Sequence, residues 1–478
     1  MDRERFLSRY APPATLPLAG VCTLLVVISA AACVAPGGLT AAEPLNVVFF
    51  LTDDQRPDAI GALGGQVATP HTDRLIERGF TFRHAYTMGS MVGAVCLPSR
   101  TQLLTGMSMF RARNEPSSDD SRRYTLPRAL RAAGYASLRT GKQGNHPDAV
   151  CREFDEYVSI PRRTDCSTEH ADRAIAWIDQ HAGQRPFFVL LSFATPHDPQ
   201  PAPDEYYQRY RPETLRLSAN FRPVHPFDNG ELLVRDELTL PLPRSPDEVR
   251  AKLARYFASI TYTDDQIGRV LAALDKAGVA DRTLVVFASD NGLSLGDHGL
   301  LGKQNLYEQG GMHVPLVVAG PGVPHGASDA LVYLFDLFPT ICELAGFDAP
   351  AAIDGRSLAG VIQGRARGVR EAVLTAYKDI QRGVRDDRWK LIRYPQIDRW
   401  QLFDLDHDPA ELNDLAGDPR YAERLEQMQA LLVGLQREFD DPCPLVVDEP
   451  QTGEIDLDEL RRQAEEAAET LRQRGQLF

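Results

Sequence analysis

The 478-residue sequence has no surplus of positive charge. Its 52 lysine and arginine residues face 66 aspartate and glutamate residues, which gives a formal net charge of −14. Proteins that bind nucleic acid usually present a basic face, because they must neutralise phosphates. The composition therefore argues against a nucleic-acid partner. An anionic substrate would need a locally positive pocket on this acidic molecule.

Long apolar runs are absent after the first 42 residues, and the chain has neither internal repeats nor long low-complexity tracts. Residues 1–42 carry three arginines among their first nine positions, continue with an apolar stretch over residues 16–35 and end on small residues. This pattern is typical of a secretory signal peptide. A retained membrane anchor is one alternative, because the stretch approaches the length of a span. A lipoprotein site at Cys33, after three alanines, is another. We expect an exported protein, periplasmic or secreted, without a stable membrane span.

Cysteine is scarce in the rest of the chain. Two of the seven cysteines fall in or near the signal, and an exported protein can form disulfides with the others. Cys151 and Cys166 bracket a short polar segment and are candidates for one disulfide. Cys342 lies in an apolar stretch and is expected to be a buried thiol. Cys443 stays unassigned, and the surroundings of Cys96 set it apart.

Three apolar runs without alternation predict strands that are buried on both faces. They cover residues 46–51, 186–193 and 283–289, and Val, Phe and Leu dominate them. Runs of this kind are typical of a parallel sheet. Helices are predicted between them over residues 73–79, 125–133 and 245–278. The alternation indicates an α/β fold with a large, mostly parallel sheet that is flanked by helices on both faces.

The helix over residues 245–278 has the clearest start signal. Pro246 stands at its first position, and Ser245 with Glu248 predicts a capping box. Residues 199–244, which are rich in Pro and Tyr, predict a long surface excursion. Its tyrosines could form a carbohydrate-binding face, although such residues often pack locally.

The pattern changes near residue 365. Short strand candidates separated by charged turns predict a small antiparallel sheet, and two terminal helices follow it. The strand candidates cover residues 371–377, 381–384, 389–394 and 400–405, and the helices cover residues 421–439 and 457–471. We therefore divide the chain into a signal peptide (1–42), a catalytic α/β domain (43–364) and a smaller C-terminal α+β domain (365–478).

Polar residues follow each of the three buried runs. Asp53 and Asp54 end one, His197 follows another, and Asp290 with Asn291 ends the third. Ligands of open α/β sheets bind beyond the carboxyl ends of the strands. Adjacent carboxylates repel one another unless a positive charge lies between them, and a hard dication serves this purpose. Each pair taken alone could be a helix cap or a turn. Their shared placement at strand ends favours a metal site.

Residues 96–106 read Cys-Leu-Pro-Ser-Arg-Thr-Gln-Leu-Leu-Thr-Gly. This segment resembles the signature of the sulfatase family, Cys-x-Pro-Ser-Arg followed by Leu-Thr-Gly. The alternative is a free cysteine in a turn before a helix. The resemblance continues from Asn46 to residues 403–409, and residues 53–57 and 94–96 are similar to iduronate-type glycan sulfatases.

The resemblance implies that Cys96 is oxidised to formylglycine by a formylglycine-generating or sulfatase-maturing enzyme. The hydrated aldehyde would attack sulfur with one hydroxyl. It would then expel sulfate by collapsing to the aldehyde through the other hydroxyl. A cysteine or serine ester lacks this exit.

Carried over residue by residue, the resemblance also implies a bound ion. The ion would be calcium, with magnesium as the alternative, and would acidify the nucleophile. Its ligands would be Asp53, Asp54, Asp290, Asn291 and the modified Cys96.

Four cationic or ionisable residues match further positions of the family. Arg100 would bind the hydrated aldehyde and the metal-site carboxylates. Lys142 and Lys303 would contact the sulfate, and His197 would face the leaving oxygen. Taken singly, His197 could be a capping histidine, and Lys142 and Lys303 could be solvated lysines.

The chain departs from the family at two positions. Gly144 stands where a histidine usually follows the lysine by two residues, and His146 could reach the same place from a rearranged loop. His313 stands where the family often has arginine before Val-Pro, and we expect this position to be structural.

These observations predict a sulfuric ester hydrolase that acts on a sulfated small molecule or, as we expect, a glycan. The alternatives are a phosphate or phosphonate ester hydrolase on the same scaffold and a binding protein that has lost catalysis. The missing histidine motivates the last of these.

Overall fold

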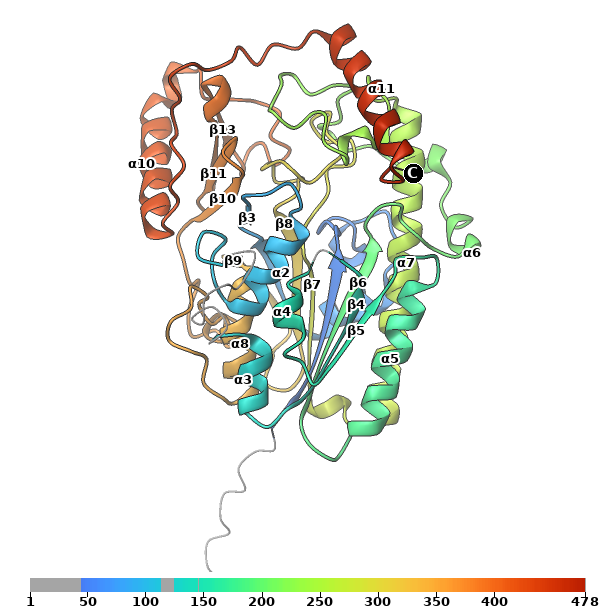
Figure 1. Ribbon diagram of the computed structural model, residues 1–478. Coiled ribbons are helices and arrows are strands. Elements are labelled where there is room, and N and C mark those ends of the chain that lie inside the picture. Colours follow the sequence, from blue (N-terminus) through green and yellow to red (C-terminus); the bar gives the residue numbers. More distant parts are fainter. Residues whose placement is uncertain (1–43, 113–123, 145, 478) are drawn as a thin grey trace, which may run out of the picture. The chain divides into compact units, whose positions relative to one another are not determined.

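The computed structural model describes residues 44–112, 124–144 and 146–477. The predicted signal peptide lies outside these residues. A sheet of eight strands forms the centre of the fold, in the order β5-β4-β6-β1-β7-β8-β2-β9 (Figure 1). The strands are β1 (Asn46–Asp53), β2 (Phe80–Tyr86), β4 (Ala136–Lys142), β5 (Glu156–Ile160), β6 (Phe187–Pro196), β7 (Thr283–Ser289), β8 (His313–Ala319) and β9 (Gly326–Tyr333).

The large sheet is mostly parallel, as predicted. Only β8 runs against its neighbours β7 and β2, whereas every other adjacent pair is parallel. The three strands that the apolar runs predicted are β6, β1 and β7, and they lie side by side in the middle of the sheet. Every residue of these strands is buried, which explains their unbroken apolar sequences.

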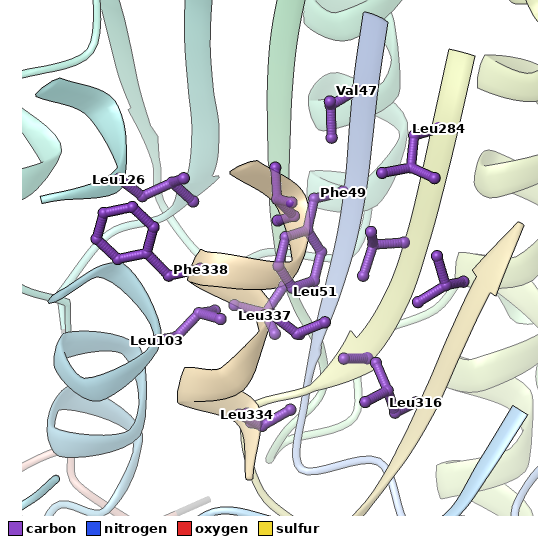
Figure 2. Close-up of a cluster of buried hydrophobic side chains, with 14 of the residues drawn as sticks. Val47, Phe49, Leu51, Leu103, Leu126, Leu284, Leu316, Leu334, Leu337 and Phe338 are labelled. Atoms are coloured by element: carbon purple, nitrogen blue, oxygen red, sulfur yellow. The ribbon is translucent and has the colours of Figure 1, made fainter. Parts of the chain in front are cut away.

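Helices cover both faces of this sheet. On one face, Val47, Phe49 and Leu51 of β1 pack against α2 (Cys96–Thr105), α3 (Leu126–Ala132) and α8 (Leu337–Ala345), as Figure 2 shows. On the other face, Val48 and Phe50 pack against α1 (Pro70–Arg78), α5 (Cys166–His181) and α7 (Pro246–Lys276). Alternate residues of one strand thus anchor opposite helical layers.

Phe49→Ala tests how much this core contributes to the stability of the fold. Phe49 is only 1% exposed and lies among the apolar side chains of Figure 2, so its removal leaves a cavity. We expect a loss of about 3–5 kcal/mol in the free energy of unfolding, measured in urea. Val446→Ala is the control, because Val446 is 71% exposed and should change stability by less than about 0.5 kcal/mol. Equal effects of the two substitutions would contradict this packing.

A second sheet has the order β13-β12-β11-β10-β3. β10 (Val373–Tyr377), β11 (Gln381–Arg385), β12 (Trp389–Tyr394) and β13 (Arg399–Asp404) form the predicted antiparallel meander. α10 (Ala422–Glu438) packs on it. The unpredicted strand β3 (Gly89–Ser90) comes from early in the chain and pairs with β10 in parallel. The domain boundary at residue 365 stays a prediction.

Residues 199–244 form the expected excursion. It contains only α6 (Asp204–Tyr207) and the short 3-10 helices η2 (Pro212–Thr214) and η3 (Glu237–Thr239). α11 (Leu457–Gln473) contacts η3, and its buried face belongs to one apolar cluster with residues of the excursion and of the second sheet. The remaining short elements are η1 (Gly61–Leu63), α4 (Asp148–Cys151), η4 (Ala280–Arg282), η5 (Leu334–Asp336), α9 (Ala359–Ile362), η6 (Pro395–Ile397) and η7 (Pro419–Tyr421). None of the helices in the described part of the chain has the length and apolarity that a membrane crossing requires.

Two local predictions are wrong. The Ser245 side chain makes no capping hydrogen bond, and its backbone carbonyl instead accepts from Val249 at 3.0 Å. Cys151 and Cys166 are free thiols, because each side chain packs into a separate apolar cluster. The expectation for Cys342 is confirmed, since this residue is fully buried.

Candidate active site

Two neighbouring strands deliver the carboxylates of the site to one edge of the sheet. Thr52 of β1 pairs with Ser289 of β7 in parallel register, so the residues that follow both strands emerge side by side. The backbone N–H of Asp54 donates to Asp290 Oδ1 at 3.2 Å. As a result, four of the predicted site residues lie close together. One ligand atom from each of Asp53, Asp54, Cys96 and Asp290 lies within 4.8 Å of the other three.

Asp54 has a strained backbone conformation. Its φ of 71° lies in the left-handed region, which residues with a side chain rarely adopt. The Tyr256 hydroxyl donates to the Asp54 carbonyl at 2.7 Å and, with the bond to Asp290, holds this conformation. Strain of this kind persists where the surroundings over-determine it, and it is common at functional sites.

Cys96 is the first residue of α2 and is 2% exposed. Its Sγ lies 3.4 Å from Asp53 Oδ1 and 3.3 Å from Lys303 Nζ. The Ser99 hydroxyl donates to the Asp290 carbonyl at 2.6 Å and ties this end of α2 to the strand ends. Burial raises the pKa of the Cys96 thiol well above its usual range, and Asp290 raises it further. An unmodified Cys96 is therefore a neutral thiol and a poor nucleophile.

Buried cations compensate the carboxylates. Arg100, one helical turn after Cys96, places Nη2 3.1 Å from Asp53 and Nε 2.8 Å from Asp290. Lys142 at the end of β4 also pairs with Asp53. Lys303 Nζ lies 2.7 Å from Asp54 Oδ1. Charges buried this deeply persist only when they are paired.

The pKa values show that two of the three carboxylates, Asp54 and Asp290, still lack compensating positive charge. Burial raises the pKa of Asp53, but Lys142 and Arg100 outweigh it and hold that pKa well below its usual range. Burial raises the pKa of Asp54 to about 8, despite Lys303. Burial and the neighbouring Asp53 raise the pKa of Asp290. A further cation between these groups would stabilise all three ionised forms.

Asn291 fits such a cation. It directly follows Asp290 and is fully buried, and its Oδ1 and Nδ2 have no hydrogen-bond partner among the described residues. A buried amide without partners costs free energy unless a ligand satisfies it. Three carboxylates and one amide oxygen form a donor set of the kind that calcium and magnesium prefer.

His197 directly follows β6 and faces the carboxylates. Its Nε2 lies 3.7 Å from Asp54 Oδ2, and Arg162 Nη1 lies 2.6 Å from its Nδ1. Burial lowers the pKa of His197 well below its usual range, and Lys303 and Lys142 lower it further, so the imidazole is neutral. Arg162 donates to Nδ1, which leaves Nε2 to carry the proton toward the site. The sequence reading missed Arg162, because no motif surrounds it.

His146 does not take the place of the missing family histidine. Its Nδ1 lies 2.8 Å from the Gly144 carbonyl, and its Nε2 contacts Tyr157 and Asp148. The ring therefore bridges its own loop to β5. His313 has the expected structural role, since its Nε2 donates to the Arg83 carbonyl at 2.7 Å.

Another group of ionisable residues, formed by His84, Glu308 and His313, could hold a metal by its spacing. Cations already occupy it. Glu308 accepts from Arg385 at 2.7 Å and from Lys390 at 2.9 Å, and Arg385 also lies 3.1 Å from His84. Burial raises the pKa of Glu308, but Arg385 and Lys390 outweigh it and hold that pKa well below its usual range. Unlike Asp54 and Asp290, this carboxylate is already compensated, so the group is an ion-pair network.

Cys96 lines a cavity of about 630 Å³. The cavity walls come from loops, the excursion and the end of α11, and they comprise Gly93, Ala94, Val95, Arg162, His197, Val234, Arg235, Asp236, Lys303, Gln304, Leu471, Gly475 and Gln476. The tyrosines of the excursion are not among these residues. The ring centroids of Tyr206 and Tyr262 lie 5.3 Å apart, and those of Tyr210 and Phe257 lie 5.9 Å apart, so these tyrosines pack locally.

The chain belongs to the sulfatase family, whose sequence pattern it matches over residues 45–347. Residues 296–438 match the family N-sulphoglucosamine sulphohydrolase, C-terminal. Choline-sulfatase of Rhizobium meliloti is 33% identical over 73% of this chain and 78% of its own length. The protein is thus a sulfatase-family enzyme, a hydrolase.

Other relatives are more distant. N-acetylglucosamine-6-O-sulfatase of Bacteroides thetaiotaomicron is 26% identical over 90% of this chain and 92% of its own length. Human iduronate 2-sulfatase is 27% identical over 69% of this chain and 75% of its own. The phosphonate monoester hydrolase structure of Agrobacterium radiobacter has a TM-score of 0.71 at 22% identity and covers 83% of this chain and 96% of that chain. This last similarity shows a shared fold.

Proposed function

We propose that the protein is an exported sulfuric ester hydrolase that removes sulfate from a sulfated glycan. It uses formylglycine made from Cys96 and one divalent cation, calcium, with magnesium as the alternative. The observation that carries this proposal is the convergence of Cys96 with three buried carboxylates at one cavity. The relatives that act on N-acetylglucosamine-6-O-sulfate and iduronate 2-sulfate, by their names, support a glycan substrate.

The residues around Cys96 have separate roles in this reaction. Formylglycine supplies a hydrated aldehyde as nucleophile, and the cation supplies positive charge against it and against the sulfate. Arg100 holds Asp53 and Asp290 in place for the cation. Lys142 and Lys303 provide the positive field that a sulfate needs on an acidic protein. His197 presents its Nε2 proton to the leaving oxygen, where negative charge develops.

The proposal includes export of the chain and the enzymatic oxidation of Cys96. The signal-like sequence of residues 1–42 supports a periplasmic or secreted location. A formylglycine-generating or sulfatase-maturing enzyme would have to act on Cys96 before folding ends, since this side chain is 2% exposed in the folded chain.

Hydrolysis of phosphate or phosphonate esters is the second candidate. Its support is the fold shared with a phosphonate monoester hydrolase, together with the similar tetrahedral geometry of phosphate and sulfate monoesters. Kinetics on 4-nitrophenyl sulfate, 4-nitrophenyl phosphate and phenyl phosphonate esters separate the two. A higher kcat/KM for the sulfate supports the proposal, and a higher value for either phosphorus ester overturns it.

Removal of the cation should inactivate the enzyme and lower its thermal stability. We expect dialysis against EDTA to abolish sulfate release and lower Tm, because the carboxylates then repel one another. Calcium at 100 times its Kd should raise the free energy of unfolding by about 2.7 kcal/mol relative to the metal-free protein. The readouts are differential scanning fluorimetry and sulfate release.

Asn291→Ala should reduce the calcium-induced rise in Tm, since it removes one buried ligand without leaving a charge unpaired. Asp247→Ala is the control, because this carboxylate is 94% exposed and lies at the start of α7. The metal assignment is wrong if Asn291→Ala keeps the full calcium response.

A further inference from the structure

The C-terminal segment of the chain returns to the active site. α11 begins at Leu457, beyond the family matches over residues 45–347 and 296–438. Residues 439–456 lead to it from α10, and Figure 1 shows this connection in red. Hydrogen bonds to its backbone carbonyls hold its path. The Leu445 carbonyl accepts from the Arg393 side-chain Nε at 2.6 Å, and the Gly453 carbonyl accepts from the Asp228 backbone N–H at 2.9 Å.

One face of α11 determines how the helix sits. Leu460, Ala464 and Ala468 follow one another at intervals of four residues and are 9%, 8% and 6% exposed. They belong to the same buried cluster as apolar side chains of the excursion, Phe227, Leu232, Leu238 and Leu242. The opposite face carries exposed ion pairs such as Arg462 with Glu466. The small alanines let the helix approach the excursion closely, which fixes its rotation.

The same face leads into the cavity. Leu471 follows Ala468 by three residues and, with Gly475 and Gln476, lines the cavity that contains Cys96. Leu477, at 7% exposure, anchors the chain again in the cluster behind α11. Leu471, Gly475 and Gln476 therefore lie between two anchors, the buried face of α11 and Leu477.

We propose that the end of α11 is the outer wall of the substrate cavity and that Leu471 is a specificity-determining residue for the leaving group. This inference rests on the proposed sulfatase activity. The sulfate must lie at Cys96 and Lys303, so the rest of the substrate must occupy the space bordered by Val234 and Leu471. A cavity of about 630 Å³ has the size of a small-molecule site.

Two properties of the leaving group follow. Leu471 and Val234 are apolar, so on their side of a cavity that charged residues line elsewhere they favour a ring that presents a C–H or aryl face. A polymer bound at an internal unit would have to pass the end of α11, because Leu471, Gly475 and Gln476 line the cavity. We therefore expect the enzyme to prefer a single ring-sized unit, either free or at the end of a chain.

Leu471→Trp tests this wall in the full-length, matured protein with 4-nitrophenyl sulfate as the probe. We expect the added volume to raise KM about tenfold, as overpacking by about 1.4 kcal/mol implies, with little change in kcat. Arg472→Trp is the matched control. It places the same side chain one residue later, where Arg472 is 55% exposed, and should behave as the wild type.

A second variant ends the chain after Asp456 and so removes α11. We expect its ratio of kcat/KM on sulfated polysaccharide (dextran sulfate) to that on 4-nitrophenyl sulfate to rise relative to the wild type. The Leu471→Trp and Arg472→Trp pair decides the question even if the shortened chain does not fold. Equal KM values for that pair overturn the inference, whereas absence of sulfate release by the matured wild type would overturn the proposed function instead.

Discussion

Cys96→Ala should abolish sulfate release and leave the fold intact. Loss of a covalent nucleophile typically costs on the order of 10⁶ in kcat. The side chain borders a cavity and polar groups rather than an apolar core, so its removal should leave Tm nearly unchanged. Sulfate release by ion chromatography and circular dichroism during heating provide the two readouts.

Cys342→Ala is the matched control for this experiment. Cys342 is also a buried cysteine, but it lies in the apolar cluster on α8. Its substitution should lower Tm while kcat stays at the wild-type value. A Cys96→Ala variant that keeps turnover, or that loses stability as Cys342→Ala does, would contradict the role given to Cys96.

The second large effect is expected for His197→Ala. A sulfate ester reacts through a loose transition state, in which charge builds up on the leaving oxygen. A donor that strengthens its bond as this charge develops raises kcat, whereas uniform binding only lowers KM. Loss of one preorganised donor costs about 10²–10³ in kcat. We expect this loss for alkyl and sugar sulfates, and a much smaller one for 4-nitrophenyl sulfate, whose leaving group needs little help.

His225→Ala controls for damage to the fold. This histidine is buried, donates to the His298 carbonyl at 2.7 Å and packs on Phe227, so its loss should lower stability without dependence on the leaving group. An equal fall in kcat for the sugar and nitrophenyl substrates of His197→Ala would show that His197 is only a binding or structural residue.

The central part of the fold was predictable because burial on both faces leaves a simple pattern. β6, β1 and β7 lie in the middle of the sheet and contain almost only apolar residues. The strands β2, β4, β5, β8 and β9 were not predicted. The first five residues of β9 are partly or fully exposed, and β2 carries Arg83 and His84, so neither forms a continuous apolar run. β2 also changes register after Phe82, which interrupts its periodicity.

The site was predictable to a different degree for each residue. The rule that ligands gather at strand ends pointed to Asp53 and Asp290 without any family knowledge. Arg100 and Lys303 came only from the family resemblance, because neither stands at the end of a predicted strand. Arg162 and the end of α11 could not be found, since their contribution depends on how distant loops fold back on the cavity.

The most direct measurement compares the aldehyde content at position 96 with sulfate release. Batches of the protein, made with increasing amounts of a formylglycine-generating enzyme, are analysed by mass spectrometry of the peptide that carries residue 96. The same batches are then assayed with 4-nitrophenyl sulfate at saturating calcium. The account predicts that kcat rises in proportion to the fraction of chains with formylglycine and extrapolates to zero for the unmodified thiol. Full activity in chains that retain the Cys96 thiol would contradict it.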